Sequence, residues 1–338
     1  MTYSGMFLRS YIGQQPGQNQ GGWSASPDII FAGTTPAADP TVYTSSANYN
    51  KDYGSTVYLN QVNYVYIRGF NNTTASETAR IWFYYTRSDL ALWPSNWFAN
   101  NIQVAGNMVN YTTMTASQNE IGVTNPPFLW TPPPLNSGNN HYCAIAFAEN
   151  PPLSSPPQSP APTGYMGSTS ELANFILSNP NMAWRNTVDV SVNTPSWQTT
   201  TNITGSTEGG QLQIGIQCTN MPNDSYVAFS VPGPDAQNTI NVPKMQISNG
   251  NLALSLPVNW PAGFQSSITI SYWQGSTNPQ VGASIVPTLW IPQTQVSYET
   301  QLKTRHRPVY VHAFESPRML YLAPVKMYVI GAVPYRFS

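Results

Sequence analysis

The chain has 338 residues, enough for two ordinary domains that each bury a hydrophobic core. Only 8% of the residues are charged, the net charge is −1 and 41% are hydrophobic, which excludes the disordered class, where low hydrophobicity accompanies high net charge. The neutral balance also argues against nucleic acid as the main partner, because phosphate binding depends on clustered Lys and Arg.

Residues 1–25 are predicted to form a flexible arm, since they contain the Gln- and Gly-rich tract QQPGQNQGG (14–22). No basic segment followed by an apolar one opens the chain, so we expect no cleaved signal peptide. No apolar run approaches the ~18 residues of a membrane span. The compartment stays unknown, with cytoplasmic synthesis followed by release or non-classical export as one route to an extracellular structure.

Residues 26–195 are predicted to form a β-sandwich. Aromatic and β-branched residues recur in alternation along its strand segments, as in a half-buried strand. These segments are SPDIIFAG (26–33), VYLNQVNYVYIRGFNN (57–72), ARIWFYYT (79–86), HYCAIAFAEN (141–150) and NMAWRNTVDVSV (181–192). One helix is expected, SELANFILS (170–178), because Ser168 and Glu171 have the spacing of a capping box.

Residues 196–298 are predicted to form a second antiparallel β-sandwich, because short strand-like runs recur between turns. The runs are QLQIGIQC (211–218), YVAFSV (226–231), LALSL (252–256), SITISYW (267–273) and SIVPTLWI (284–291). The tail, residues 299–338, is strand-like and basic, with six of the thirteen Lys and Arg residues. We expect it to close the second sheet or to pair with another copy. The fold class is therefore all-β.

Four stretches within residues 26–195 resemble bacterial immunoglobulin-like domains of the cell-adhesion-related type. They are SPDIIFAG, VYIRGFNNTTASETARIWFYYT, FLWTPPPLNSGNNHYCAIAFAENP and NPNMAWRNTVDV, in the order of the family's strands. The resemblance implies an immunoglobulin-like sandwich and a role in adhesion or as an accessory module. It leaves residues 196–338 unassigned, and a fold alone says little about function.

His141 and Cys143 stand two apart on a predicted strand, so their side chains point to the same face. A Cys–His nucleophile needs hydrogen-bond contact and an orienting acid, whereas Cys143 continues into the apolar row of Ile145 and Phe147. We therefore expect a buried core cysteine. Cys143 could form a disulfide with Cys218, but we favour the alternative that both are buried free thiols.

Reactive side chains form no recognisable catalytic motif. His306, His312 and Glu315 are close in sequence, but their spacing mixes the two faces of a strand and does not favour a metal site. The other acids are scattered singly, without support for the converging pair that glycoside hydrolysis needs. We therefore predict no catalytic residue, no metal and no cofactor, and we expect that the protein is not an enzyme.

Aromatic residues are the remaining lead to a contact surface, because their rings anchor interfaces and stack on flat ligands. Trp93 and Trp97 flank Pro94 in a predicted loop and, with Trp23, are the candidates for ligand contact. The candidates for assembly through the terminal segments are Phe7, Arg9, Tyr310, Tyr321 and Tyr328.

The favoured function is a non-catalytic structural or adhesive protein that self-associates, or assembles into a larger extracellular or particle-like structure. Its terminal segments would add strands to a neighbour's sheets, as in donor-strand assembly, and its low charge reduces repulsion between copies. The alternative is a carbohydrate-binding or toxin-like effector that recognises a host cell surface, with surface glycans or other proteins as partners. A hydrolase of unrecognised type is the least favoured.

Overall fold

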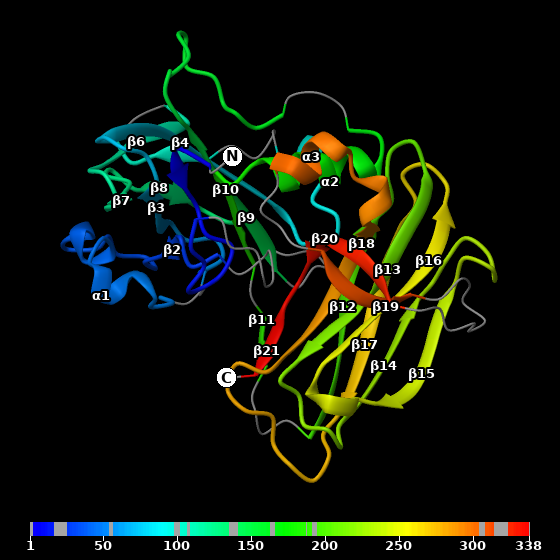
Figure 1. Cartoon of the computed structure of the whole chain (residues 1–338). Helices are drawn as coiled ribbons and strands as arrows, with labels where there is room; N and C mark the ends of the chain where they lie inside the picture. The colour runs from blue at the N-terminus through cyan, green and yellow to red at the C-terminus, as the bar shows by residue number, and fades with distance from the viewer. Residues whose placement is uncertain are drawn as a thin grey trace.

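The chain folds into two β-sandwiches that lie side by side (Figure 1). The computed structural model describes residues 3–16, 26–53, 57–97, 102–106, 109–134, 141–162, 166–186, 188–190, 195–303, 308–313 and 324–337. Strands of these residues form four sheets, two in each sandwich. No helix in the described ranges is long and apolar enough to cross a membrane. The predicted all-β fold with two successive sandwiches is confirmed.

The first sandwich is built from the first and second sheets. The first sheet contains β1 (Met6–Phe7), β2 (Ile29–Phe31), β3 (Asn63–Asn71), β5 (Gln103–Val104), β7 (Ile121–Val123) and β8 (Phe128–Trp130), with the short helix α1 (Ser46–Tyr49) before β3. The second sheet contains β4 (Glu77–Arg87), β6 (Tyr111–Ala116), β9 (Tyr142–Glu149) and β10 (Met182–Arg185). Apolar side chains from both sheets, such as Ile67 and Phe83, fill the space between them.

β9 is buried on both of its faces, which accounts for the composition of HYCAIAFAEN. The small side chains Ala144, Ala146 and Ala148 face the first sheet. The larger Cys143, Ile145 and Phe147 face the other way, toward the helix α2 (Thr169–Ser178) and the second sandwich. The expected apolar row is confirmed as buried, but it lies at the junction of the sandwiches rather than inside the first one.

The helix α2 begins where its capping box predicts. The Ser168 hydroxyl accepts a hydrogen bond from the backbone N–H of Glu171, and the Glu171 carboxylate accepts one from the backbone N–H of Ser168. Leu172 and Ile176 on its buried face then pack into the junction between the sandwiches.

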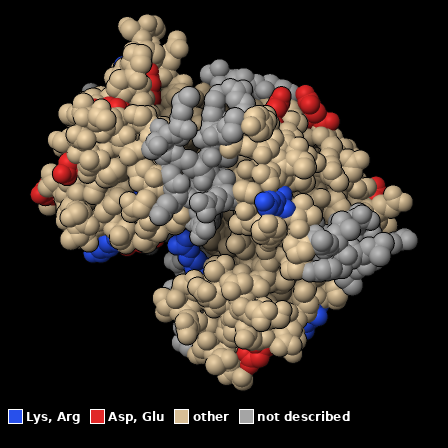
Figure 2. All heavy atoms as spheres, viewed as in Figure 1, with Lys and Arg blue, Asp and Glu red and all other residues tan. Residues whose placement is uncertain are grey.

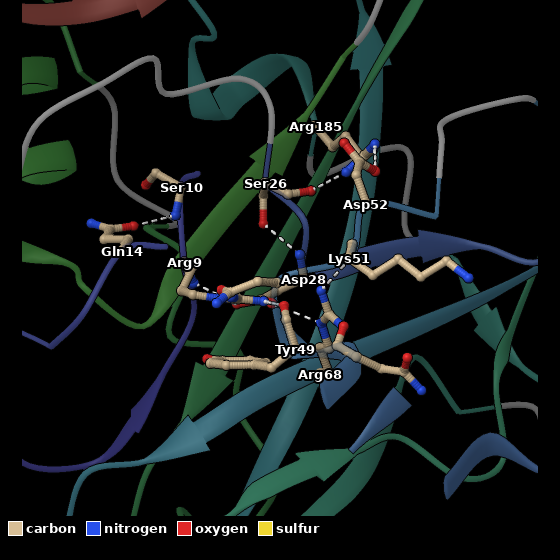
Figure 3. A network of polar contacts seen from close by, with 12 residues as sticks. Arg9, Ser10, Gln14, Ser26, Asp28, Tyr49, Lys51, Asp52, Arg68 and Arg185 are labelled. Carbon is tan, nitrogen blue, oxygen red and sulfur yellow. Dashed lines mark hydrogen bonds and ion pairs between the residues drawn. The ribbon is translucent and has the colours of Figure 1, made fainter. Parts of the chain in front are cut away.

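Charged side chains are few and far apart on the face of the molecule in Figure 2. Three further charged side chains, Arg9, Asp28 and Arg68, are buried together on the outer face of the first sheet, where α1 covers them (Figure 3). Arg9 Nη2 lies 2.6 Å from Asp28 Oδ1, and Arg68 Nε lies 3.0 Å from the same oxygen. The backbone N–H of Arg9 also donates to Asp28 Oδ2 at 2.7 Å, and its guanidinium lies 3.3 Å above the ring centre of Tyr49. One carboxylate therefore joins the N-terminal segment to β3.

This cluster shows that the expectation of a free N-terminal arm is wrong for residues 3–16. β1 pairs with β3, where Met6 is opposite Asn71 and Phe7 opposite Phe70. Met6 and Phe7 are buried with Leu8, so the segment completes the first sheet and its core. Residues 17–25 lie outside the described residues.

The second sandwich is built from the third and fourth sheets. The third sheet contains β11 (Val188–Val190), β13 (Gly210–Thr219), β16 (Leu252–Trp260), β18 (Ser284–Pro292), β19 (Val309–Ala313), β20 (Val325–Ala332) and β21 (Tyr335–Phe337). The fourth sheet contains β12 (Ser196–Thr204), β14 (Tyr226–Val231), β15 (Ile240–Gln246) and β17 (Gln265–Trp273). The helix α3 (Tyr298–Lys303) lies near α2 (Figure 1).

The third sheet curls until it closes on itself. β20 pairs with both β18 and β19, and β19 pairs with β16, which completes a ring through β13. Trp290, Val311 and Met327 form a small separate core there. Of the two roles expected for the tail, residues 308–313 and 324–337 fulfil the first, because they close the second sandwich. They are part of that domain and not a separate segment.

The two sandwiches share one hydrophobic core. Trp82 and Tyr84 of β4 belong to the same cluster as Ile203 of β12 and Leu289 of β18. The link between the domains is also clamped to the end of the chain, since β11 pairs in parallel with β21. The sandwiches are therefore packed against each other and not joined by a loose linker.

We expect the substitution Gly331→Ala in β20 to destabilise the junction. An added Cβ would lie 1.7 Å from the carbonyl oxygen of Leu90, so one of the sandwiches would have to shift. Overpacking of this kind costs about 1–3 kcal/mol, which thermal unfolding followed by circular dichroism would detect. Gly205→Ala is the matched control, because its added Cβ would lie 3.3 Å from the nearest atom, the carbonyl oxygen of Phe264. Equal melting temperatures for Gly331→Ala and the wild type would contradict the close contact.

Candidate functional site

The two tryptophans predicted for ligand contact are buried, with 2% of Trp93 and 1% of Trp97 exposed. Trp93 Nε1 donates a hydrogen bond to the carbonyl oxygen of Thr204 at 3.0 Å. Trp97 stacks on Phe147, with ring centroids 5.7 Å apart. Their prediction as an exposed surface is therefore wrong, because the second sandwich and α2 cover the loop that carries them. Trp23 lies outside the described residues.

Most of the residues proposed for assembly are also buried. Phe7, Arg9 and Tyr328 lie inside the fold, so they are not surface contacts for a second copy. Tyr310 on β19 is 64% exposed. Tyr321 lies outside the described residues.

His141 and Cys143 are buried side chains of the junction. Burial raises the pKa of the Cys143 thiol far above its ordinary value, which is the reverse of what a reactive cysteine requires. Both Cys143 and Cys218 are buried free thiols, as favoured from the sequence, and the disulfide alternative is wrong. His141 Nε2 lies 3.2 Å from the side-chain amide of Asn186, and burial lowers the pKa of this histidine to about 4.

We expect His141 to make the fold less stable as the pH falls from about 6.5 to about 4. The unfolded chain takes up a proton near the ordinary histidine pKa of 6.5, whereas the folded chain does so only near 4, so acid favours unfolding within this window. The loss approaches about 3 kcal/mol, since each pKa unit corresponds to ~1.4 kcal/mol. The measurement is urea unfolding of wild type and His141→Gln from pH 7 to pH 4. Parallel stability curves for the two proteins would contradict this assignment.

Of the other candidate residues for chemistry, the structure describes one. His312 lies on β19, while His306 and Glu315 lie outside the described residues. Within the ranges that the structure describes, no group of three or more His, Cys, Asp or Glu side chains is placed to hold a metal ion.

A groove of about 710 Å³ lies where the two sandwiches meet. Residues 86–89 and Asn96 of the first sandwich form one wall. Residues 202–204, at the end of β12, and 265–267, at the start of β17, form the other. The lining consists mainly of hydroxyl and amide side chains, with the exposed Arg87 beside them. This is the candidate functional site, and we call it the junction groove.

Asp89 fixes the floor of the junction groove. Its Oδ1 accepts hydrogen bonds from the backbone N–H groups of Thr204 at 2.9 Å and Ala91 at 3.1 Å, and its Oδ2 accepts one from the Thr204 hydroxyl. The backbone N–H of Leu90 donates to the carbonyl oxygen of Asn202 at 2.8 Å. Desolvation raises the pKa of Asp89 to about 6, although its hydrogen bonds lower it. These contacts hold both walls in place before any ligand arrives.

The sequence did not single out the junction groove, because Ser, Thr, Asn and Gln are abundant throughout the chain. One signal was present in β12, SWQTTTNIT, whose outward positions are all polar from end to end. A strand with one polar face and no charge marks a surface that is exposed yet able to form many hydrogen bonds.

No protein-family model matches the chain, and no curated protein matches it either. Among solved structures, the collagen adhesin of S. aureus aligns with 82% of this chain and 88% of its own, at 8% identity and a TM-score of 0.22. The collagen-binding domain of the Erysipelothrix rhusiopathiae surface protein RspB aligns with 84% of this chain and 94% of its own, at 9% identity and a TM-score of 0.17. At such TM-scores neither likeness assigns a function, so the resemblance to cell-adhesion-related domains stays a prediction.

Proposed function

We propose that this protein is a non-catalytic adhesive protein that binds a neutral, hydroxyl-rich ligand, such as a surface glycan, in the junction groove. The observation that carries the proposal is the lining of the groove, where hydroxyl and amide groups from both sandwiches converge on one open space. Hydroxyl and amide groups both donate and accept hydrogen bonds, as the hydroxyls of a sugar do.

The lining also argues against an apolar small molecule as the ligand. Pockets for such molecules are mainly hydrophobic with a few placed polar groups, whereas the junction groove is polar along both walls. A strongly charged ligand would need several paired charges, because a charge without a partner is costly to desolvate, and Arg87 is the one cation among the described lining residues. A neutral polyhydroxylated ligand can form hydrogen bonds with the groove and needs neither an apolar lining nor a paired charge.

The non-catalytic part of the proposal rests on Asp89. Both oxygens of its carboxylate accept hydrogen bonds that hold β12, which is a structural role. Glycoside hydrolysis needs two carboxyl groups on opposite sides of the bond that is cut. Among the lining residues that the structure describes, Asp89 is the one carboxylate.

Binding of the full chain to an array of neutral glycans, followed by calorimetry with the retained glycan, tests the proposal. The double substitution Asn202→Ala with Gln265→Ala removes polar groups from adjacent strands of one wall. A lost hydrogen bond costs about 1 kcal/mol, so the pair should weaken binding by roughly tenfold or more.

The matched control is Thr78→Val with Thr115→Val. These hydroxyls form a pair 2.8 Å apart on β4 and β6, outside the junction groove, so their loss should leave the affinity unchanged. No retention of any neutral glycan would overturn the proposed function. If a glycan is retained and the groove substitutions do not weaken its binding, the binding site lies outside the junction groove.

Self-association through the terminal segments has less support than glycan binding. Residues 3–16 and 324–337 already pair with strands of their own chain, so donating them to a neighbour would first require unpairing β1 or β21. Light scattering of the purified chain measures its oligomeric state directly. A defined oligomer would restore self-association as part of the function, while a monomer would leave glycan binding as the basis of adhesion.

A further inference from the structure

The junction groove opens onto the outer face of the fourth sheet. The last two outward pairs of β12 and β17 are Asn202 opposite Ser267 and Thr204 opposite Gln265, and all four residues line the groove. The outward residues that precede them on β12 therefore continue the same surface. We call this surface, made of the outward residues of β12, β17, β14 and β15, the polar face.

On β12 and β17 the polar face is a regular array of uncharged groups arranged in rows across the two strands. Thr200 lies opposite Thr269, and their hydroxyls are 3.1 Å apart. In the next row Gln198 Nε2 donates to the Ser271 hydroxyl at 3.0 Å. Neighbouring strands are about 4.8 Å apart and outward residues of one strand about 6.8 Å apart, so hydroxyl and amide groups repeat at fixed spacing.

An aromatic pair ends the polar face at the far side from the groove. Trp273 lies opposite Ser196 on one side and Tyr226 on the other, and both rings are partly exposed. The ammonium group of Lys244 lies 4.7 Å from the ring centre of Trp273 and 4.8 Å from that of Tyr226. Lys244 is the one charged residue on these four fully described strands, and the two rings hold it.

We infer that the polar face and the junction groove form one continuous binding site for an extended, neutral polysaccharide chain. The inference rests on the proposed function and deepens it, because it names a polymer rather than a short sugar as the ligand. From the row of Thr204 and Gln265 to the row of Ser196 and Trp273, the site spans roughly 27 Å, the length of eight residues along a strand.

The chemistry of the site fits such a chain along its whole length. The groove encloses one part of the ligand, the Thr and Ser rows offer hydrogen bonds to the middle, and at the other end the partly exposed rings of Trp273 and Tyr226 offer apolar surface beside the Lys244 ammonium that they hold. A sugar ring has hydroxyls at its rim and C–H groups on its faces, so it uses both kinds of contact. A neutral polymer also matches the near absence of charge on these strands.

Affinity electrophoresis of the full chain in gels that contain hydroxyethyl cellulose, dextran or galactomannan identifies the polymer. Calorimetry then compares a disaccharide and a hexasaccharide of the retained polymer. We expect the hexasaccharide to bind at least about tenfold more tightly, because only the longer chain reaches from the groove to Trp273.

Substitutions separate the two ends of the site. Trp273→Ala, and Thr200→Val with Thr269→Val, should reduce hexasaccharide binding to the level of the disaccharide and leave the disaccharide unchanged. Asn202→Ala with Gln265→Ala should weaken both ligands. Tyr298→Ala is the aromatic control, since Tyr298 is 75% exposed on α3 and does not belong to the polar face. Thermal unfolding of each variant confirms that it is folded.

Three results would overturn the inference. Equal affinity for the disaccharide and the hexasaccharide would limit the site to the groove and leave the proposed function standing. A change in oligomeric state in Trp273→Ala, with polymer binding intact, would make the polar face a contact between copies. No retention in any gel, together with no glycan retained on the array, would overturn the proposed function itself.

Discussion

Replacing Asp28 with asparagine is expected to destabilise the protein by about 3–5 kcal/mol, the cost of removing one partner from a buried ion pair. The side chains of Arg9, Arg68 and Asp28 are all fully buried, and both guanidiniums contact the same carboxylate oxygen. Asparagine keeps the shape of the carboxylate but removes its charge, so two positive charges would remain buried without compensation. Urea unfolding of the purified protein measures the loss.

Asp52→Asn is the control for this experiment. Asp52 also contacts an arginine, Arg185, but its side chain is 28% exposed and water can replace part of the interaction. The loss of stability in Asp52→Asn should therefore be clearly smaller than in Asp28→Asn. If Asp28→Asn cost less than about 1 kcal/mol, as exposed ion pairs do, the buried cluster would not hold the N-terminal segment.

Replacing Trp97 with alanine is expected to cost about 3–5 kcal/mol, the range for removal of a large buried aromatic side chain. Trp97 is 1% exposed, stacks on Phe147 and lies in the core that the sandwiches share. The cavity would form between β9, α2 and the loop after β4, where both domains would have to move to fill it. The midpoint of urea unfolding reports the effect.

Trp273→Ala serves as the comparison, since Trp273 is partly exposed on the polar face and leaves no enclosed cavity. Its loss of stability should be small. Similar losses of stability for both substitutions would mean that Trp97 is not packed as the structure describes and lies on the surface instead.

Local patterns in the sequence were sufficient to predict most of the strands. QLQIGIQC and SITISYW, expected at 211–218 and 267–273, correspond to β13 (Gly210–Thr219) and β17 (Gln265–Trp273). The capping box at Ser168 placed α2 to within one residue of its observed start. In each case the signal lies within a few neighbouring residues, where alternation and capping act directly.

The contacts between distant segments could not be predicted in this way. Trp93 looked exposed because Pro94 and Asn96 indicate a turn, yet it is buried and its indole N–H donates to the carbonyl oxygen of Thr204, more than a hundred residues later. Arg9 looked like a surface residue because nothing near it in sequence shows that it pairs with Asp28 in a buried cluster under α1. The junction groove has the same origin, since its walls come from segments that only the packing of two domains brings together.

The shared core also decides how the chain can be divided. A fragment that ends near residue 187 would leave Trp82 and Tyr84 of β4 without the cover of Ile203 and its neighbours. A fragment that begins at 196 would lack β11, the partner of β21. Each half would present a large apolar patch to water, and such patches promote aggregation. The chain forms two domains, but their shared core means that they fold and remain stable only as one unit.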